Sequence, residues 1–243
     1  MNDNEMIRKR FMELSHRAFE RNYTTYSDFL NCDEINILYD TKTETNFKLY
    51  GGYNYAQRCV AAFGNETNDY PIVCIKAEPL QQKFADKLNH RDFLGSLMNL
   101  GIERDMLGDI IIKDNVGYIF CLDKISNYII NELDRIKHTS IKAIIIKEIP
   151  EFINAQPEIE KITVSSIRVD TVTAAVFNIS RNSVTQLVNR QKIFINSRTI
   201  YKESVLLKQG DIISVRGYGK FVFYQTINET KKHKQLREVG IYK

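Results

Sequence analysis

Short apolar segments of strand length alternate with helical patterns in the middle of this chain, and this order constrains its fold more than any other feature. The sequence predicts strands over residues 70–77, 108–113, 116–122 and 141–149. Helices are predicted over residues 91–100 and from Asp123, which can cap the second one. The resulting order β-α-β-β-α-β is the split βαβ, ferredoxin-like plan.

RNA-recognition motifs share this plan, and their third strand carries aromatic rings that stack on bases. Gly117, Tyr118 and Phe120 fit that signature loosely. The leading basic residue is missing, and Ile119 stands where a small residue is usual. Alternate apolar residues on one strand are also typical of a buried face, so we favour core packing over base stacking for these rings.

The flanking segments complete an α+β fold class. Apolar residues at helical spacing predict an amphipathic helix over residues 4–21, with Ile7, Phe11, Leu14 and Ala18 on one face. Short helices are expected over 24–38 and a strand over 47–50. We therefore predict an N-terminal α+β region (1–68), a central ferredoxin-like domain (69–157), a C-terminal domain (165–226) and a basic tail (227–243).

The charge is distributed unevenly along the chain. The net charge is +4, but residues 165–226 carry +6 and residues 227–243 carry +3, which leaves −5 for residues 1–164. A basic module attached to an acidic body suggests a polyanionic partner for the last third. A solvated basic surface without a partner would show the same asymmetry, and charge alone does not separate these two interpretations.

The last third also has a regular pattern. Val169, Val172 and Val176 share one face of a helix, and Ser180 is placed to cap the next. Strands are predicted over residues 193–196, 212–216 and 221–224. In this order and spacing, residues 168–217 resemble the S-four RNA-binding domain, which is named after the fourth protein of the small ribosomal subunit. The resemblance implies that a helical pair presents basic residues to structured RNA.

We expect the RNA contacts of this domain to come from basic and polar side chains on the second helix, the short strand and the turns. Arg and Lys neutralise phosphate, and the planar guanidinium of Arg adds paired donors. Arg168 and Asp170 are expected to pair with each other or with the sheet. The expected contacts are Arg181, Arg190, Lys192, Asn196, Arg198, Lys202, Arg216 and Lys220.

A wider resemblance covers nearly the whole chain. Gly51, Gly52 and Tyr53, the run from His90 to Gly95, and the segments 100–102 and 108–110 look like the YlmH family. These are bacterial cytoplasmic proteins with a central domain like an RNA-recognition motif and a C-terminal S-four domain. The resemblance implies association with the large ribosomal subunit, rRNA and tRNA in ribosome-associated quality control of stalled translation. It also implies a link to cell division.

Other classes of function have less support in the sequence. We expect no enzyme activity; the alternatives are an RNA-modifying enzyme, such as a divergent pseudouridine synthase built around Arg168, Val169 and Asp170, or a protein adaptor for cell division. The four cysteines and four histidines lack the spacing of a metal site, so we expect no metal and no cofactor. No apolar run approaches the roughly 18 residues that span a bilayer, and we expect a cytoplasmic protein without a membrane partner.

Overall fold

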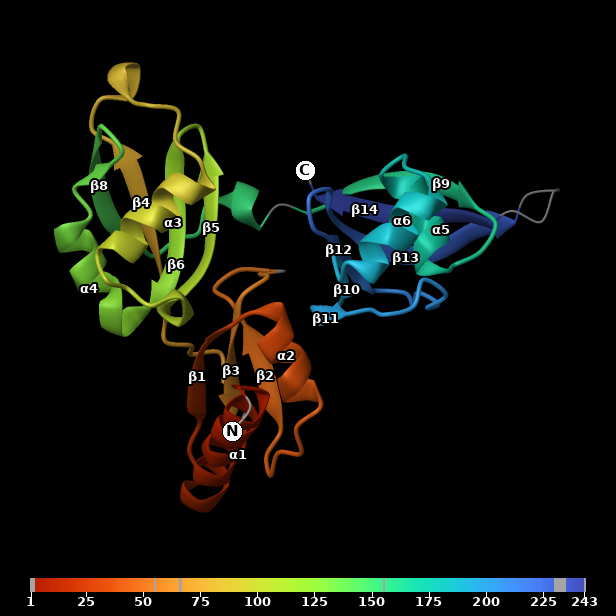
Figure 1. Ribbon diagram of the computed structural model, residues 1–243, viewed down its shortest axis with the longest axis horizontal. Helices are drawn as coiled ribbons and strands as arrows, with labels where there is room; N and C mark the ends of the chain where they lie inside the picture. The colour runs from red at the N-terminus through yellow and green to blue at the C-terminus, as the bar shows by residue number, and fades with distance from the viewer. Residues whose placement is uncertain (1–2, 55, 66, 155, 230–234, 243) are drawn as a thin grey trace. The chain divides into compact units, whose positions relative to one another are not determined.

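The computed structural model describes residues 3–54, 56–65, 67–154, 156–229 and 235–242, without the side chains of 225–229. The chain divides into two compact units, Met1–Asn154 and Ala155–Lys243, whose elements are labelled in Figure 1. The first unit contains the expected N-terminal region and the expected central domain as far as Asn154. Among the described residues, no helix is both long and apolar enough to cross a membrane.

The N-terminal part of the first unit packs two helices with a small antiparallel sheet of order β1-β3-β2. Phe11, Leu14 and Ala18 of the first helix are buried, and Ile7 packs against the same core, as the helical spacing predicted. The elements are α1 (Asp3–Arg21), β1 (Thr25–Leu30), α2 (Cys32–Tyr39), β2 (Phe47–Tyr50) and β3 (Cys59–Phe63).

The expectation of short helices over residues 24–38 is wrong in its first half, because β1 is a strand. Its buried positions alternate, but two of them hold polar residues, Thr25 and Ser27, which hide the apolar period of a strand. Both hydroxyl groups are satisfied inside the fold: Thr25 Oγ1 donates to the Leu14 carbonyl at 2.8 Å, and Ser27 Oγ accepts from the Ala61 amide at 2.9 Å.

The central part follows the predicted β-α-β-β-α-β order. Its antiparallel sheet has the order β5-β6-β4-β8-β7, in which the short strand β7 is an addition. The helix that begins at Asp123 has no side-chain cap, since its N-cap residue is Leu122. The elements are β4 (Ile72–Pro79), η1 (Gln82–Phe84), α3 (His90–Asn99), η2 (Arg104–Met106), β5 (Leu107–Lys113), β6 (Val116–Leu122), α4 (Asp123–Glu132), β7 (Arg135–Ile136), β8 (Thr139–Ile146) and η3 (Glu151–Ile153).

Both faces of this central sheet carry apolar clusters. On one face, Phe93 and Leu97 of α3 and Ile129 of α4 pack against strand residues such as Ile75 and Ile119. The opposite face has a separate cluster that contains Cys74, Tyr118, Phe120 and Leu122, together with residues from outside the central domain. Apolar side chains are therefore buried on both faces of the sheet.

The residues that cover the second face come from the N-terminal part and from the segment that follows β8. Phe29 and Val60 are buried in this cluster, and the ring of Tyr53 lies 4.9 Å from that of Phe120 between centroids. The Tyr53 hydroxyl donates to Asp109 Oδ2 at 2.8 Å, and the Gln57 amide donates to the same oxygen at 2.6 Å. Apolar packing and hydrogen bonds thus join the two parts of the first unit.

The C-terminal unit consists of two helices and an antiparallel sheet of order β11-β10-β12-β13-β14-β9. The predicted helices and the strands at 193–196, 212–216 and 221–224 are all present, and Ser180 caps the second helix as expected. The elements are β9 (Glu158–Val164), α5 (Val169–Val176), α6 (Arg181–Asn189), β10 (Ile193–Ile195), β11 (Arg198–Thr199), β12 (Ile212–Val215), β13 (Gly219–Glu229) and β14 (Gln235–Tyr242).

The gap between the expected central and C-terminal domains and the expected basic tail (227–243) both contain strands. Strand β14 pairs with β13 on one side and with β9 on the other, from Gln235–Val164 to Ile241–Glu158. Strand β9 was not predicted, because five of its seven residues are exposed, three of them charged, and only Val164 is buried. In β14, the buried residues are Val239 and Gly240, too few to give a strand period.

We predict that Gly117→Ala destabilises the first unit. A Cβ at this position would lie 2.2 Å from the ring of Phe93, which is fully buried. Overpacking of this kind costs about 1–3 kcal/mol. The variant should have a lower urea midpoint than the wild type, measured by circular dichroism.

The matched control is Gly95→Ala on helix α3, where an added Cβ would meet nothing within 4 Å. This change should stabilise the protein by up to about 1 kcal/mol, since alanine is the better helix former. Equal stability of Gly117→Ala and the wild type would contradict the packing described for Phe93.

Candidate nucleic-acid interface

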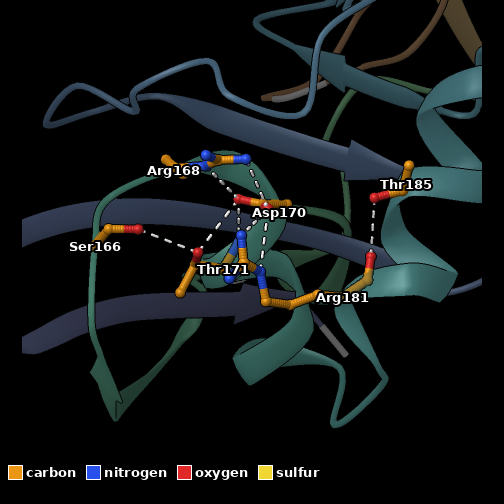
Figure 2. Close-up of polar contacts among 6 residues, drawn as sticks. All are labelled: Ser166, Arg168, Asp170, Thr171, Arg181 and Thr185. Atoms are coloured by element: carbon orange, nitrogen blue, oxygen red, sulfur yellow. Dashed lines mark hydrogen bonds and ion pairs between the residues drawn. The ribbon is translucent and has the colours of Figure 1, made fainter.

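The carboxylate of Asp170 organises the basic end of the helical pair in the C-terminal unit (Figure 2). Its side chain is 3% exposed and receives hydrogen bonds from two guanidinium groups. Arg168 donates through Nε to Oδ1 at 3.0 Å and through Nη2 to Oδ2 at 3.1 Å. Arg181 donates through Nε and Nη2 to Oδ2, at 3.1 and 2.5 Å. The expected pairing of Arg168 with Asp170 is confirmed, and Arg181 joins it.

The same carboxylate is also bonded by its own helix. The Thr171 amide and hydroxyl both donate to Asp170 Oδ1, at 2.8 and 3.2 Å, and Ser166 Oγ lies 3.1 Å from the Thr171 hydroxyl. Burial acts to raise the pKa of Asp170, but the hydrogen bonds and positive charges of Arg181 and Arg168 outweigh it, so the pKa is lowered. The carboxylate therefore stays ionised at neutral pH.

This network fixes the direction of Arg181 without burying it. The Arg181 side chain is 55% exposed. Arg181 is the first residue of α6 and directly follows the N-cap residue Ser180. Two arginines on one carboxylate leave one positive charge in excess, held in a set orientation. Such a guanidinium can still meet a phosphate with little loss of side-chain entropy.

The other end of α6 brings two more predicted residues together with a strand. The helix ends in a left-handed turn at Gln191 (φ 54°), and the Lys192 amide donates to the Leu187 carbonyl at 2.9 Å. This is the hydrogen-bond pattern of a Schellman cap. The Arg216 amide donates to the Lys192 carbonyl at 2.9 Å. Arg190, Lys192 and Arg216, all exposed, are thus neighbours, and we call them the basic corner.

Arg216 and Lys220 lie on the outer face of the sheet, above aromatic rings. The Arg216 guanidinium lies 4.9 Å from the ring centroid of Phe194, and Lys220 Nζ lies 6.0 Å from that of Tyr242. Strand pairing places Phe194, Ser214 and Lys220 in one row across this face. The stacking holds the charge of Arg216 at the surface while covering Phe194, which is 3% exposed.

The remaining predicted residues are less closely grouped. The side chain of Asn196 is used inside the fold: Nδ2 donates to Asp211 Oδ1, and Oδ1 accepts from the Ile212 amide, both at 2.9 Å. Arg198 is exposed and pairs with Ile195, at the end of β10 away from the basic corner. Lys202 is exposed in the segment that follows β11. We therefore omit Asn196 from the proposed contacts.

One exposed ring beside the basic corner was missed in the sequence. Tyr218 is 47% exposed in the turn after Arg216, and its ring lies 5.8 Å from that of Phe177. An aromatic residue between two glycines, with basic residues on either side, could have drawn attention to this position. A tyrosine in a turn between Arg216 and Lys220 is able to stack on an unpaired base.

In the central domain, the rings on β6 are part of the core, as we favoured. Tyr118 is 9% exposed and Phe120 is fully buried. Phe152 covers Tyr118 at a centroid distance of 5.2 Å, and Tyr53 covers Phe120. The close contact of Gly117 with Phe93 gives that glycine a packing role. These rings are not available for stacking on bases in the structure described here.

Two of the four cysteines, Cys74 and Cys121, are buried on neighbouring strands of the central sheet. Burial raises the pKa of Cys74 and of Cys121 to about 12, so both remain thiols at neutral pH. Within the described parts of the chain, no group of three or more His, Cys, Asp or Glu side chains has the arrangement of a metal site.

The chain is similar to a family model, a curated protein and a solved structure. Residues 66–147 match the family model described as "Putative RNA-binding domain in YlmH". The chain is 26% identical over 215 residues to "Ribosome-associated protein quality control protein P2" of Bacillus subtilis (strain 168), covering 86% of this chain and 83% of that protein. The solved "Cell division protein ylmH from Streptococcus pneumoniae" is 18% identical and covers 62% of this chain and 93% of that one, with a TM-score of 0.47.

We predict that Asp170→Asn lowers the stability of the C-terminal unit at pH 7 by about 1–3 kcal/mol, because charge-assisted hydrogen bonds to Arg168 and Arg181 are lost. The folded-state pKa of Asp170 lies below its unfolded value of about 3.9. The stabilisation by its charge is therefore present above that value and lost as the pH falls through the folded-state pKa.

Urea unfolding of the wild type and the variant at pH 7 and at pH 2.5 measures this effect. The difference in stability should shrink at the lower pH. A difference of the same size at both pH values would show that the charge of Asp170 contributes nothing.

Proposed function

The matches confirm the resemblance to the YlmH family that the sequence motifs predicted, and from this premise we propose that the chain is a non-catalytic RNA-binding protein of the ribosome. The observation that carries the proposal is the similarity over 86% of the chain to a protein named for ribosome-associated quality control. The match of residues 66–147 to an RNA-binding domain supports it independently of that name.

The geometry of the C-terminal unit supports a phosphate-binding surface on structured RNA. The basic corner, Arg181 and Lys220 present positive charges that stacking, strand pairing or Asp170 holds in place. We propose that this unit is an S-four domain that docks on rRNA of the large subunit or on tRNA, with Arg198 and Lys202 as peripheral contacts. Binding of this kind is driven mainly by phosphate neutralisation and weakens with salt.

The enzyme alternative has less support from the same site. A pseudouridine synthase built around residues 168–170 would need Asp170 as the reacting carboxylate. Here that side chain is 3% exposed, and both of its oxygens accept hydrogen bonds from arginines. We propose instead that Asp170 positions Arg181. The protein would then act in the cytoplasm on stalled translation complexes, without a cofactor.

This proposal predicts sedimentation with large ribosomal subunits. The tagged wild type should co-migrate with large subunits in a sucrose gradient at low salt. A Lys192→Glu, Arg216→Glu double variant, shown to be folded by circular dichroism, should stay at the top, because it reverses two charges of the basic corner. The control, Lys9→Glu, Lys42→Glu, makes the same charge change at exposed positions of the N-terminal part and should migrate like the wild type.

Either of two results would overturn the proposal. If the wild type stays at the top of the gradient at low salt, the ribosome is not its partner. If its position depends on a nuclease-resistant protein complex, the cell-division adaptor becomes the better hypothesis.

The proposal also predicts how binding to isolated large subunits depends on salt concentration. Lys192→Ala should reduce the slope of log affinity against log salt concentration by about one unit, since one phosphate contact is lost. Filter binding at several salt concentrations measures the slope. An unchanged slope would remove Lys192 from the interface while leaving the other contacts open to the same test.

A further inference from the structure

The central domain matches an RNA-binding family model, yet the sheet face that RNA-recognition motifs use is covered by Tyr53, Phe29 and Phe152. RNA contact by this domain therefore needs another surface. The most exposed large apolar side chain in the described residues of this domain is Phe84, which is 78% exposed. Leu80, four residues earlier, is 62% exposed.

These two side chains border a cavity of about 260 Å³. One wall is the loop between β4 and α3, which contributes Leu80, Gln81, Phe84 and Ala85. The other wall is the turn from His138 to Ser140 at the start of β8. The cavity combines an aromatic ring with polar groups of His138 and Ser140. This is the composition of a site for a planar, partly polar ligand.

The loop that carries Phe84 is fixed rather than free. The Leu80 amide donates to the Ser140 carbonyl at 2.9 Å. Asp86 Oδ2 accepts from the His138 amide at 3.1 Å and from the Thr139 hydroxyl at 3.2 Å, while the Asp86 amide donates to Thr139 Oγ1 at 2.8 Å. An exposed ring on such a loop pays little entropy when it binds a partner.

A second anchor comes from the hairpin between β5 and β6. Asn115 Nδ2 donates to the Asp86 carbonyl at 2.8 Å, and Asn115 Oδ1 accepts from the Leu88 amide at 2.7 Å. Gln82 Nε2 donates to the Asp114 carbonyl at 2.7 Å. Asp114 and Asn115 both have positive φ, the conformation of a tight hairpin turn. The loop is thus held at both ends and in its middle.

The charges around the cavity favour a polyanion. None of the residues that line it is Lys, Arg, Asp or Glu, but the surrounding segments, residues 80–89 and 135–140, contain four Lys or Arg and a single Asp. That carboxylate, Asp86, is engaged within the loop by the hydrogen bonds above. Lys83 and Lys87 are exposed, and Lys83 Nζ lies 5.8 Å from the ring centroid of Phe84. Lys137 is paired with Asp92 at 2.7 Å and contributes less.

We propose that Phe84 and this cavity form a stacking site for an unpaired RNA base, with Lys83 and Lys87 on the adjoining phosphates. The volume admits one base rather than a duplex, and stacking on phenylalanine tolerates any base. The inference deepens the proposed RNA-binding function and rests on it. It gives the central domain a contact of its own, separate from the basic corner.

The test uses the full-length protein and a short single-stranded oligoribonucleotide, with affinity measured by fluorescence anisotropy at fixed salt. Phe84→Ala should weaken binding roughly 5- to 150-fold, the usual loss for one stacked base. Phe84→Tyr keeps the ring and should bind like the wild type. The matched control is Phe19→Ala, which removes a ring that is 65% exposed on α1 and should change nothing.

Two further measurements separate stacking from charge. Phe84→Ala should leave the salt slope unchanged, whereas Lys83→Ala should lower it by about one unit. An oligonucleotide of abasic sugars should bind the wild type and Phe84→Ala equally. Equal affinity of the two proteins for the normal oligonucleotide would overturn the inference. So would a change confined to self-association, seen by sedimentation velocity, because it would assign Phe84 to a protein contact.

Two combinations of results distinguish failure of the stacking site from failure of the proposed function. If large-subunit binding is lost in the Lys192→Glu, Arg216→Glu variant but Phe84→Ala behaves as wild type in every assay, the stacking site fails and the proposed function stands. If the wild type binds neither subunits nor the oligoribonucleotide, both fail together.

Discussion

The covering of the second face of the central sheet is the constraint on which the first unit depends. Phe120 packs against Tyr53, and Asp109 accepts hydrogen bonds from the Tyr53 hydroxyl and the Gln57 amide. Gly108 leaves room for Phe29, whose ring would lie 2.7 Å from an added Cβ. Several residues of the family motifs therefore build this junction. They give the N-terminal part and the sheet a shared apolar cluster, distinct from the cluster under the helices of the central domain.

This packing changes where the molecule can meet RNA. A split βαβ sheet with open rings would bind bases on its face, but here that face stabilises the fold instead. The exposed aromatic and basic side chains lie instead at the ends of helices and strands: in the loop around Phe84, in the turn around Tyr218 and at the basic corner. In each place a basic side chain lies beside an aromatic ring or a helix cap, and we propose that the charge contributes affinity while the neighbouring group sets the orientation.

Much of the fold could be predicted from the sequence, because residues such as Phe93, Ile119 and Val184 follow the period of their own elements. Strand β1 was missed because two of its buried positions hold hydroxyl residues, Thr25 and Ser27, which interrupt the apolar period of a strand. The basic corner was foreseen as single residues, but its grouping depends on a hydrogen bond between Arg216 and Lys192 that the linear pattern does not contain. The pairing of Arg181 with Asp170 is likewise a tertiary contact.

The pairing of β9 with β14 joins the first and last strands of the C-terminal unit. Glu158 and Ile241 face each other although all the other described helices and strands of the unit lie between them in the sequence. During synthesis, the sheet therefore remains open until the last strand has emerged from the exit tunnel. Since contacts between distant residues form slowly, this unit completes its sheet late. Until then, the edge of β9 that pairs with β14 remains unpaired near the ribosome.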